Sequence, residues 1–449
     1  MSKSGARIAY ATSAGLACTV MLLLAGGLVS GAAVSDSSAA FEDPPDLAPS
    51  ELLPASMSSG ADFHIVDPVP SDGLMRRYAI DSKFGRFNAY GRVALEVRIH
   101  EIAALTEIAK TSTIEVAVGG VGRGIGSQVQ TAVGVVAHPV ATVTGVPKGI
   151  AHLFHGYVDE GKEAAGKAQK AADPAAGGGA AGSSAVAQGE SAAKRYASRY
   201  FGLTAAERRW YEKLGVDPYT DNTVLRKAIH KIATVEAAGG FGLKFVGIPS
   251  IPGIGDIHQV MEAVYKEDPA TIRARTRATL AGYGLDQSEI ERWQNVLVLS
   301  PTRQVLLLKL AAGLDAVDGR GELFRHAMGL TSDGEAQVYL QSVELLVLAH
   351  RKQPVAGILP GLRLPAARRA DGSIVVCGAF DAVYWTSDVE RGELQIRQIL
   401  GGAGGRRDAG NRELWLDGSA SDRVRQELRD RGWTLREAAQ NSMPEAVLR

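Results

Sequence analysis

A local pattern that occurs three times between residues 194 and 350 constrains the fold more than any other feature. In each copy a glycine and a leucine precede a Ser, Thr or Asp, a glutamate follows three residues later, and an aromatic residue comes four residues after that glutamate. The three capping positions and their aromatic residues are Thr204 with Tyr211, Asp286 with Trp293, and Ser332 with Tyr339. A helix that ends at glycine, followed by a capping box, produces this order of residues. The pattern therefore predicts three joints between helices, each with a ring packed beneath the turn.

The rest of the chain predicts a mainly α fold. We expect a multi-helix domain with a short N-terminal β-hairpin and a small C-terminal α/β module. We assign residues 194–352 to the helical domain, with the apolar runs 305–308 and 343–348 as its core helices. Residues 353–449 form the α/β module. Within it, residues 374–385 and 413–416 have strand composition, residues 421–431 predict a helix, and a last strand starts at residue 432.

The segments before the helical domain differ sharply in composition. Residues 41–75 are rich in acids and prolines and lack Lys and Arg, which predicts a disordered spacer. Residues 76–163 are expected to hold a hairpin near 78–90, a helix over 92–110 and further long helices. The Ala/Gly/Ser-rich residues 164–193 predict a linker.

The first 40 residues resemble a secretory signal. Lys3 and Arg7 precede a stretch without charged residues at 8–35, and small residues follow it. We expect export to a periplasmic or extracellular location, with an uncleaved N-terminal membrane anchor as the alternative. Cys18 would leave with a cleaved signal, so Cys377 would be unpaired in the mature chain and is expected to be buried in a strand.

A possible metal site lies in the second helical stretch. His152, His155 and Asp159 are spaced to share one face of a helix and could hold Zn²⁺ or Cu²⁺, with His138 as a further nitrogen ligand. An ordinary polar face is the alternative. The glycines at 119–126 only loosely resemble a dinucleotide-binding turn, because the glycine spacing differs and no acid follows at the required distance.

Two further groups of residues have simple structural interpretations. Asp217 and Asp221 precede a predicted helix, where Asp221 would be its N-cap, and the later ligands of a calcium loop are missing. The arginines of the C-terminal region would either lie on a solvated loop surface or meet phosphate groups or the acidic spacer; they are Arg363, Arg368, Arg369, Arg406 and Arg407.

The sequence lacks the common local motifs of hydrolases, zinc proteases and nucleotide-binding loops, and a net charge of +0 argues against nucleic acid as a partner. We therefore expect an exported, envelope-associated binding or scaffolding protein rather than an enzyme. Its Gly/Val/Ala-rich helices at 114–158 could touch a membrane or a partner protein. Two alternatives stay open. One is a metal-binding protein, and the other is a secreted hydrolase with its site between the helical domain and the α/β module, using residues such as Asp381, His326 and His350.

Overall fold

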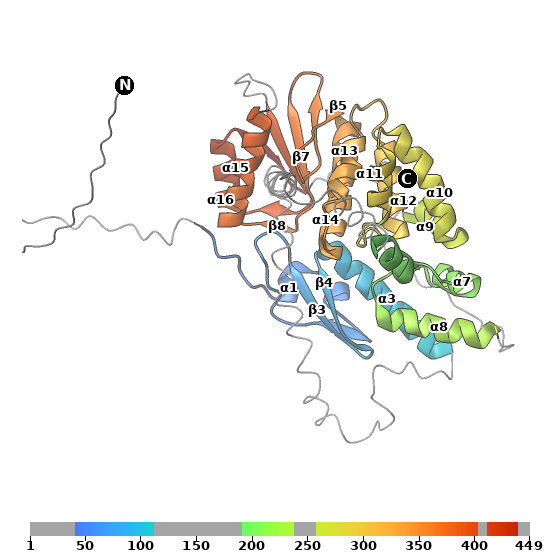
Figure 1. Ribbon diagram of the computed structural model, residues 1–449. Helices are drawn as coiled ribbons and strands as arrows, with labels where there is room; N and C mark the ends of the chain where they lie inside the picture. Colours follow the sequence, from blue (N-terminus) through green and yellow to red (C-terminus); the bar gives the residue numbers. More distant parts are fainter. Residues whose placement is uncertain (1–40, 112–190, 238–256, 403–410, 439–449) are drawn as a thin grey trace, which may run out of the picture. The chain divides into compact units, whose positions relative to one another are not determined.

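The computed structural model describes residues 41–111, 191–237, 257–402 and 411–438 (Figure 1). Within these ranges the chain is mainly helical with a β component, which confirms the expected fold class at that level. The described residues from Phe41 onward belong to one unit. The signal-like segment, most of the predicted linker, and His138, His152, His155 and Asp159 lie outside the described residues.

The first part of the chain forms an antiparallel four-stranded sheet in the order β1-β2-β3-β4. Its elements are α1 (Pro49–Leu52), α2 (Ala55–Ser58), β1 (Ser59–Gly60), β2 (Phe63–Ile65), β3 (Arg77–Ser82) and β4 (Gly85–Tyr90), followed by α3 (Arg92–Thr111). Ile80 pairs with Ile65 on one side and Phe87 on the other, so three buried side chains form a row across the sheet. Leu95, which the sequence pattern placed on the apolar face of α3, is buried as well.

The prediction of a disordered spacer at residues 41–75 was wrong. This segment contains α1, α2, β1 and β2, and its side chains at Ile65 and Val69 are buried. The acidic residues that suggested disorder are held by partners far along the chain. Asp62 accepts a hydrogen bond from Thr106 and pairs with Lys83, while Glu42 accepts one from the backbone N–H of Trp385. Composition cannot reveal partners at such separations.

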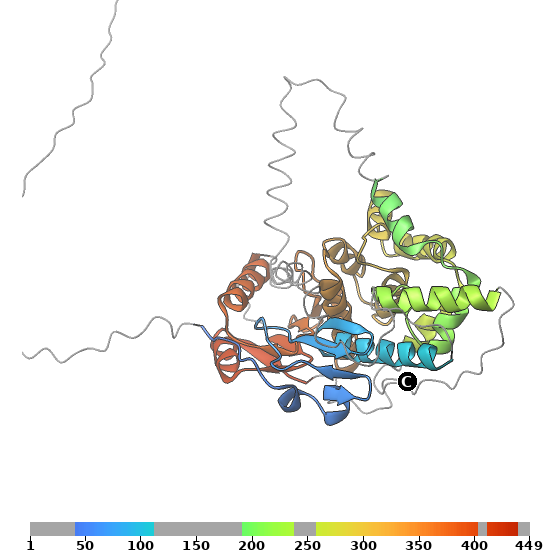
Figure 2. The ribbon, with the colours of Figure 1, turned by 90° about the horizontal axis from the view of Figure 1, so that it is seen from below.

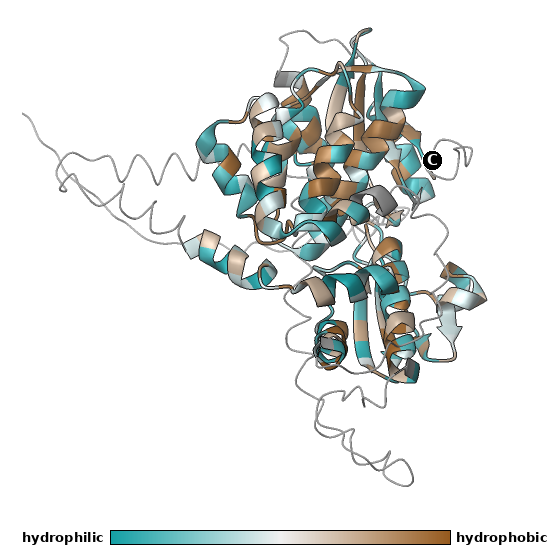
Figure 3. Cartoon of the chain, turned by 90° about the vertical axis from the view of Figure 1, so that its right-hand side faces the viewer, coloured by the Kyte–Doolittle hydropathy of each residue, from teal (hydrophilic) through white to brown (hydrophobic). Residues whose placement is uncertain are grey.

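The helical part begins with a helical stretch at residues 191–200. It continues through α7 (Ala205–Leu214), α8 (Thr223–Ala237), α9 (Ile257–Lys266), α10 (Pro269–Gly282), α11 (Gln287–Gln294), α12 (Pro301–Ala312), α13 (Gly321–Ala327) and α14 (Asp333–Lys352). Most of α14 is buried, as its run of apolar residues predicted. Figure 3 shows that helices of the protein contain both hydrophobic and hydrophilic residues.

The three predicted helix joints are present. Thr204 and Glu207 form a capping box at the start of α7, and Asp286 and Glu289 form another at α11. Ser332 caps α14 by accepting the N–H of Glu335 at 3.2 Å, and the Glu335 carboxylate accepts the N–H of Thr331. The three aromatic residues of the joints are 0–1% exposed: Tyr211, Trp293 and Tyr339.

The C-terminal part is a mixed five-stranded sheet in the order β11-β9-β7-β6-β5, with a separate parallel pair of short strands, β8 and β10. Its elements are β5 (Val355–Ile358), β6 (Ala366–Arg369), β7 (Ile374–Gly378), β8 (Ala382–Val383), α15 (Ser387–Gly402), β9 (Arg412–Leu416), β10 (Ser419–Ala420), α16 (Asp422–Asp430) and β11 (Trp433–Arg436). β7, β9 and β11 are parallel and are connected through α15 and α16. The strand expected at 374–385 is therefore two strands, because the chain turns after Gly378, where Phe380 donates its N–H to the Gly378 carbonyl.

The hydrophobic cores do not follow the predicted boundary at residue 353. One core joins α10–α14 to the five-stranded sheet, so the helical residues before 353 and the α/β residues after it share their interior. A second core joins the N-terminal sheet and α3 to α7 and α8, and Figures 1 and 2 show α3 beside α8. The third, small core contains Tyr196, Tyr200, Tyr219 and Val264.

A buried carboxylate fastens α3 to the turn before α8. Glu101 on α3 is 2% exposed and accepts hydrogen bonds from Arg98 at 2.6 Å, from Asn222 at 3.0 Å and from the hydroxyl of Thr220. Burial raises the pKa of Glu101, although Arg98 and the two other donors act against that rise. Arg98 also pairs with Asp221 at 2.7 Å. Asp221 is therefore an ion-pair partner of α3, and the predicted N-cap role belongs instead to Asn222, whose side chain accepts the N–H of Leu225.

We predict that Glu101→Ala destabilises the protein by about 3–5 kcal/mol, because it removes the acceptor of the buried Thr220 and Asn222 and one of the two carboxylates that pair with Arg98. Urea unfolding followed by circular dichroism measures the change. Glu107→Ala, on the same helix, is the control, since Glu107 forms a surface pair with Lys110 and should cost less than about 1 kcal/mol. Equal losses in the two variants would contradict this account of Glu101.

Candidate functional site

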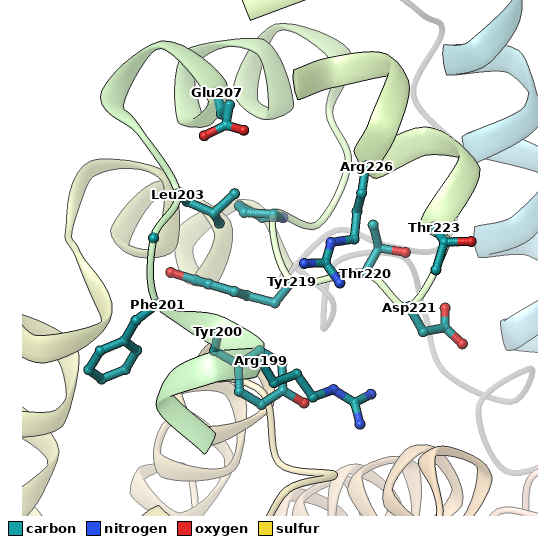
Figure 4. A pocket seen from close by; sticks show the side chains of 12 residues that line it. Arg199, Tyr200, Phe201, Leu203, Glu207, Tyr219, Thr220, Asp221, Thr223 and Arg226 are labelled. Carbon is teal, nitrogen blue, oxygen red and sulfur yellow. The ribbon is translucent and has the colours of Figure 1, made fainter. Parts of the chain in front are cut away.

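A pocket of about 340 Å³ lies between the helical stretch 191–200, the start of α7 and the turn that leads into α8 (Figure 4). This volume is at the lower end of the range for pockets that hold small organic ligands. The pocket exists because the chain reverses direction twice. Gly202, with a φ of 108°, ends the first helix, and Pro218 lies in the turn between α7 and α8. Phe201 is also among the lining residues, but it is 40% exposed and its ring points away from Tyr219 and Arg226 (Figure 4).

Tyr219 is the most informative residue of the pocket. It belongs to the small tyrosine cluster, in which Tyr196 and Tyr200 donate their hydroxyls to the carbonyls of Leu299 and Leu297 at 3.0 and 2.6 Å. Tyr219 is only 7% exposed, yet its hydroxyl has no hydrogen-bond partner among the described residues. A buried hydroxyl without a partner costs free energy. Such a group gains free energy from any rearrangement that gives it a partner, including one that accompanies binding of a ligand.

The charged residues of the pocket are mostly engaged elsewhere. Glu207 accepts hydrogen bonds from the N–H of Thr204 and from His230, both at 2.7 Å, and although burial acts to raise the pKa of Glu207, these contacts lower it overall. Asp221 is paired with Arg98, as described above, and Arg199 lies 3.3 Å from Asp333.

Arg226 differs from the other charged residues of the pocket. It lines the pocket from the first turns of α8, is exposed, and forms no ion pair or side-chain hydrogen bond with the part of the chain that the structure describes. In Figure 4 the Tyr219 ring runs between the loop that carries Leu203 and the guanidinium of Arg226, with the hydroxyl at the loop end. The pocket thus has one guanidinium without a direct partner among the described residues and, beneath its surface, one hydroxyl without a hydrogen-bond partner.

Two aspartates mark a second position of interest, where β7 and β9 end. Asp381 accepts the backbone N–H of Arg76 at 3.1 Å and of Arg92 at 3.2 Å, so it caps the start of α3 from the C-terminal part of the chain. Burial raises the pKa of Asp381. Asp417 follows β9, and burial together with the nearby charge of Asp381 raises its pKa to about 6. The carboxyl ends of parallel strands are where ligands of α/β sheets usually bind. Here, however, both oxygens of Asp381 already accept backbone N–H groups from the N-terminal part of the chain.

The structure does not assemble the residues named for a hydrolase. His326 is buried in α13, and burial lowers its pKa to about 4, with Arg325 adding to the effect. His350 lies at the end of α14 and accepts the N–H of Val355. Within the described ranges no hydrogen bond or ion pair joins either histidine to Asp381.

Cys377 and the C-terminal arginines complete the residues that the sequence singled out. Cys377 is fully buried in β7, and burial raises its pKa. Arg369 is not on a loop surface, because it is buried and pairs with Glu413 at 2.9 Å, while Arg406 and Arg407 lie outside the described residues. No group of three or more His, Cys, Asp or Glu side chains that could hold a metal ion is present in the described ranges.

Sequence reasoning missed both Arg226 and Tyr219. The segment that contains Tyr219 was interpreted as a turn with a capping aspartate, and no local pattern distinguishes a hydroxyl that will be left without a partner.

Comparison with known proteins adds nothing, since no family model, curated protein or solved structure matches the chain. Among the described helices, none has the length and apolar character that crossing a membrane requires.

We predict opposite effects for two neighbouring tyrosine substitutions. Tyr200→Phe removes a hydroxyl that donates to a carbonyl and should cost about 1 kcal/mol, whereas Tyr219→Phe removes an unpaired hydroxyl and should leave stability unchanged or raise it by up to about 1 kcal/mol. Urea unfolding without added ligand measures both. A loss for Tyr219→Phe as large as that for Tyr200→Phe would show that the Tyr219 hydroxyl is satisfied in the native protein.

We also predict that Asp417→Asn stabilises the protein at high pH only. A carboxyl whose pKa is raised in the folded state binds more protons there than in the unfolded state. The free energy of unfolding therefore falls as the pH rises from about 4 to about 6. Asn cannot ionise, and the variant should therefore gain about 2–3 kcal/mol over the native chain at pH 7.5 and almost nothing at pH 4. Thermal unfolding across this range tests the prediction. The exposed Asp430→Asn is the control and should show no such pH-dependent gain.

Proposed function

We propose that this chain is an exported, non-catalytic binding protein that holds a small organic molecule in the pocket between residues 191–200, α7 and the start of α8. The Tyr219 hydroxyl carries the proposal. It is buried in a pocket of suitable volume and lacks a partner, while its two neighbours in the tyrosine cluster are satisfied by carbonyls. A ligand whose binding displaces the chain around this oxygen would supply the missing hydrogen bond.

Binding is favoured over catalysis by the way the titratable residues are used. Glu207 closes the capping box of α7, Asp221 pairs with Arg98, and Asp381 docks the backbone of two N-terminal residues. Each of these carboxylates is therefore committed to holding the fold together.

A screen with a matched pair of variants tests the proposal. The full-length chain is mixed with a library of neutral, cationic and anionic fragments, and binding is detected by ligand-observed NMR. Thr223→Trp should abolish the hits, because Thr223 lines the pocket at the first position of α8 and the larger ring would fill it. Lys227→Trp, one turn further along α8 and outside the pocket lining, should keep them. A library without hits, or hits that persist in Thr223→Trp, would contradict the proposal.

The location of the protein is a separate proposal that rests on the first 40 residues of the sequence. Export predicts that the native cell holds the protein outside the cytoplasm, and that the N-terminus of the mature chain lies after the stretch without charged residues if the signal is cleaved. Cell fractionation followed by N-terminal sequencing measures both. Recovery of the chain from cytosolic extract with Met1 intact would overturn export and leave the pocket proposal unaffected.

The Gly/Val/Ala-rich residues 114–158 and the metal-site hypothesis at His152, His155 and Asp159 are tested separately. Flotation of the purified chain with liposomes tests contact with a membrane. Elemental analysis after zinc loading tests whether His152, His155 and Asp159 hold a metal ion.

A further inference from the structure

A shallow groove of about 450 Å³ lies along the exposed face of the helical stretch 191–200. Three basic residues, two serines and one leucine line it, namely Ser191, Lys194, Arg195, Ser198, Arg199 and Leu297. The first four of these residues are exposed, so the groove is a feature of the surface and not an enclosed cavity. It presents positive charges and hydroxyl groups to solvent.

Two of the basic residues in the groove have no carboxylate partner among the described residues. Lys194 forms no hydrogen bond or ion pair there, and Arg195 donates only to the hydroxyl of a serine in the preceding turn, at 3.1 Å. Arg199 is different, because it shares the carboxylate of Asp333 with Arg303. The charges of Lys194 and Arg195 are therefore open to an external anion.

The neighbouring helix α10 adds positive charge to the same region and contains no acidic residue. Its Arg273 lies over the ring of Tyr196, with 5.0 Å between the guanidinium carbon and the ring centre, and donates to two uncharged oxygens at the end of α11. Burial lowers the pKa of Arg273, and the nearby charge of Arg277 lowers it further, while Tyr196 acts against this change. At the start of α10, Arg275 pairs with Glu267.

An aromatic residue lies at the end of the same helical face. The N–H of Phe201 donates to the carbonyl of Ala197, so Phe201 continues the hydrogen-bond ladder of the helix. It follows Lys194 by seven positions and Ser198 by three, which places the three residues on one face. Phe201 is 40% exposed and contacts the ring of Tyr196 edge to face. Basic residues together with an exposed aromatic ring are typical of surfaces that bind the interface of a membrane.

From these observations we propose that the exposed face of the helical stretch 191–200 binds an anionic phospholipid surface. Lys194 and Arg195 contact the phosphate groups, and Phe201 lies at the boundary with the acyl chains. This surface is distinct from ligand binding in the pocket and goes beyond that function.

Two features of the sequence favour a lipid surface over another anionic partner. Residues 124–147 contain no Asp, Glu, Lys or Arg, and they belong to the segment that immediately precedes the helical stretch 191–200. The basic face is thus the first described surface that follows a stretch without charged residues. The net charge of +0 argues against a nucleic acid.

Co-sedimentation of the full-length chain with sucrose-loaded vesicles tests the proposal. One set of vesicles is made of phosphatidylcholine, and in the other about a third of the lipid is phosphatidylglycerol. The chain should bind the anionic vesicles at least about tenfold more tightly at about 0.1 M salt, and about 1 M salt should remove most of this preference because it screens the charges. Equal binding to the two sets, or a preference that salt does not reduce, would overturn the proposal.

Two double variants and one single variant assign the binding to this face. Lys194→Gln with Arg195→Gln should weaken binding to the anionic vesicles by about thirtyfold, because each basic residue near such a surface contributes about fivefold. Arg209→Gln with Lys227→Gln is the matched control. Both residues are exposed and lie outside the groove lining, so the same change in net charge should weaken binding by less than about threefold. Phe201→Ser should weaken binding by about threefold to tenfold and leave its salt dependence unchanged.

The remaining outcomes also decide the proposal. A preference for anionic vesicles that persists in Lys194→Gln with Arg195→Gln would place the lipid contact elsewhere and overturn the proposal. The lipid assignment also falls if the native chain ignores the vesicles but binds a DNA duplex or an acidic peptide through these two residues. Thr223→Trp, which fills the pocket, should leave vesicle binding unchanged. Loss of vesicle binding in that variant would show that the pocket and not this face meets the lipid.

Discussion

The buried carboxylate of Glu101 is the constraint on which much of this structure depends. It lies on a helix that packs under the N-terminal sheet, and its hydrogen-bond donors belong to its own helix and to the turn before α8. Removing a carboxylate from water is expensive unless several donors meet it, and here three of them do. The same turn contributes Tyr219, Thr220 and Asp221 to the pocket. The position of the pocket wall is therefore set by an interaction with a distant helix as well as by its own residues.

Local sequence signals predicted the elements that depend on local physics. The joints at Thr204, Asp286 and Ser332 were recognisable because a cap, a glutamate and a buried ring follow one another within eight residues. The helix 92–110 was equally recognisable, because its apolar residues recur with the helical period. In each case the free energy that decides the structure comes from neighbours in the sequence.

The parts that sequence reasoning missed depend on long-range partners. The segment 41–75 looked unable to fold because its acids and prolines leave little apolar surface to bury. In the structure Ile65 and Val69 are buried, Glu42 contacts Trp385 and Ser421, and Asp62 contacts Lys83 and Thr106. The boundary expected at residue 353 does not separate two cores, for a related reason. Most of α14 is buried, and its side chains share one core with the strands that follow. The pocket could not be predicted at all, because the difference between Tyr219 and its two satisfied neighbours appears only when the carbonyls of Leu297 and Leu299 are in place.

The contacts of Asp381 have a consequence for how the protein is made. This carboxylate accepts the backbone N–H of Arg76, which lies 305 positions earlier in the chain. A ribosome has therefore produced most of the polypeptide before the N-terminal sheet can receive this anchor, and contacts between such distant residues are slow to form. The start of α3 is therefore without this acceptor until the residues after β7 have been added to the chain.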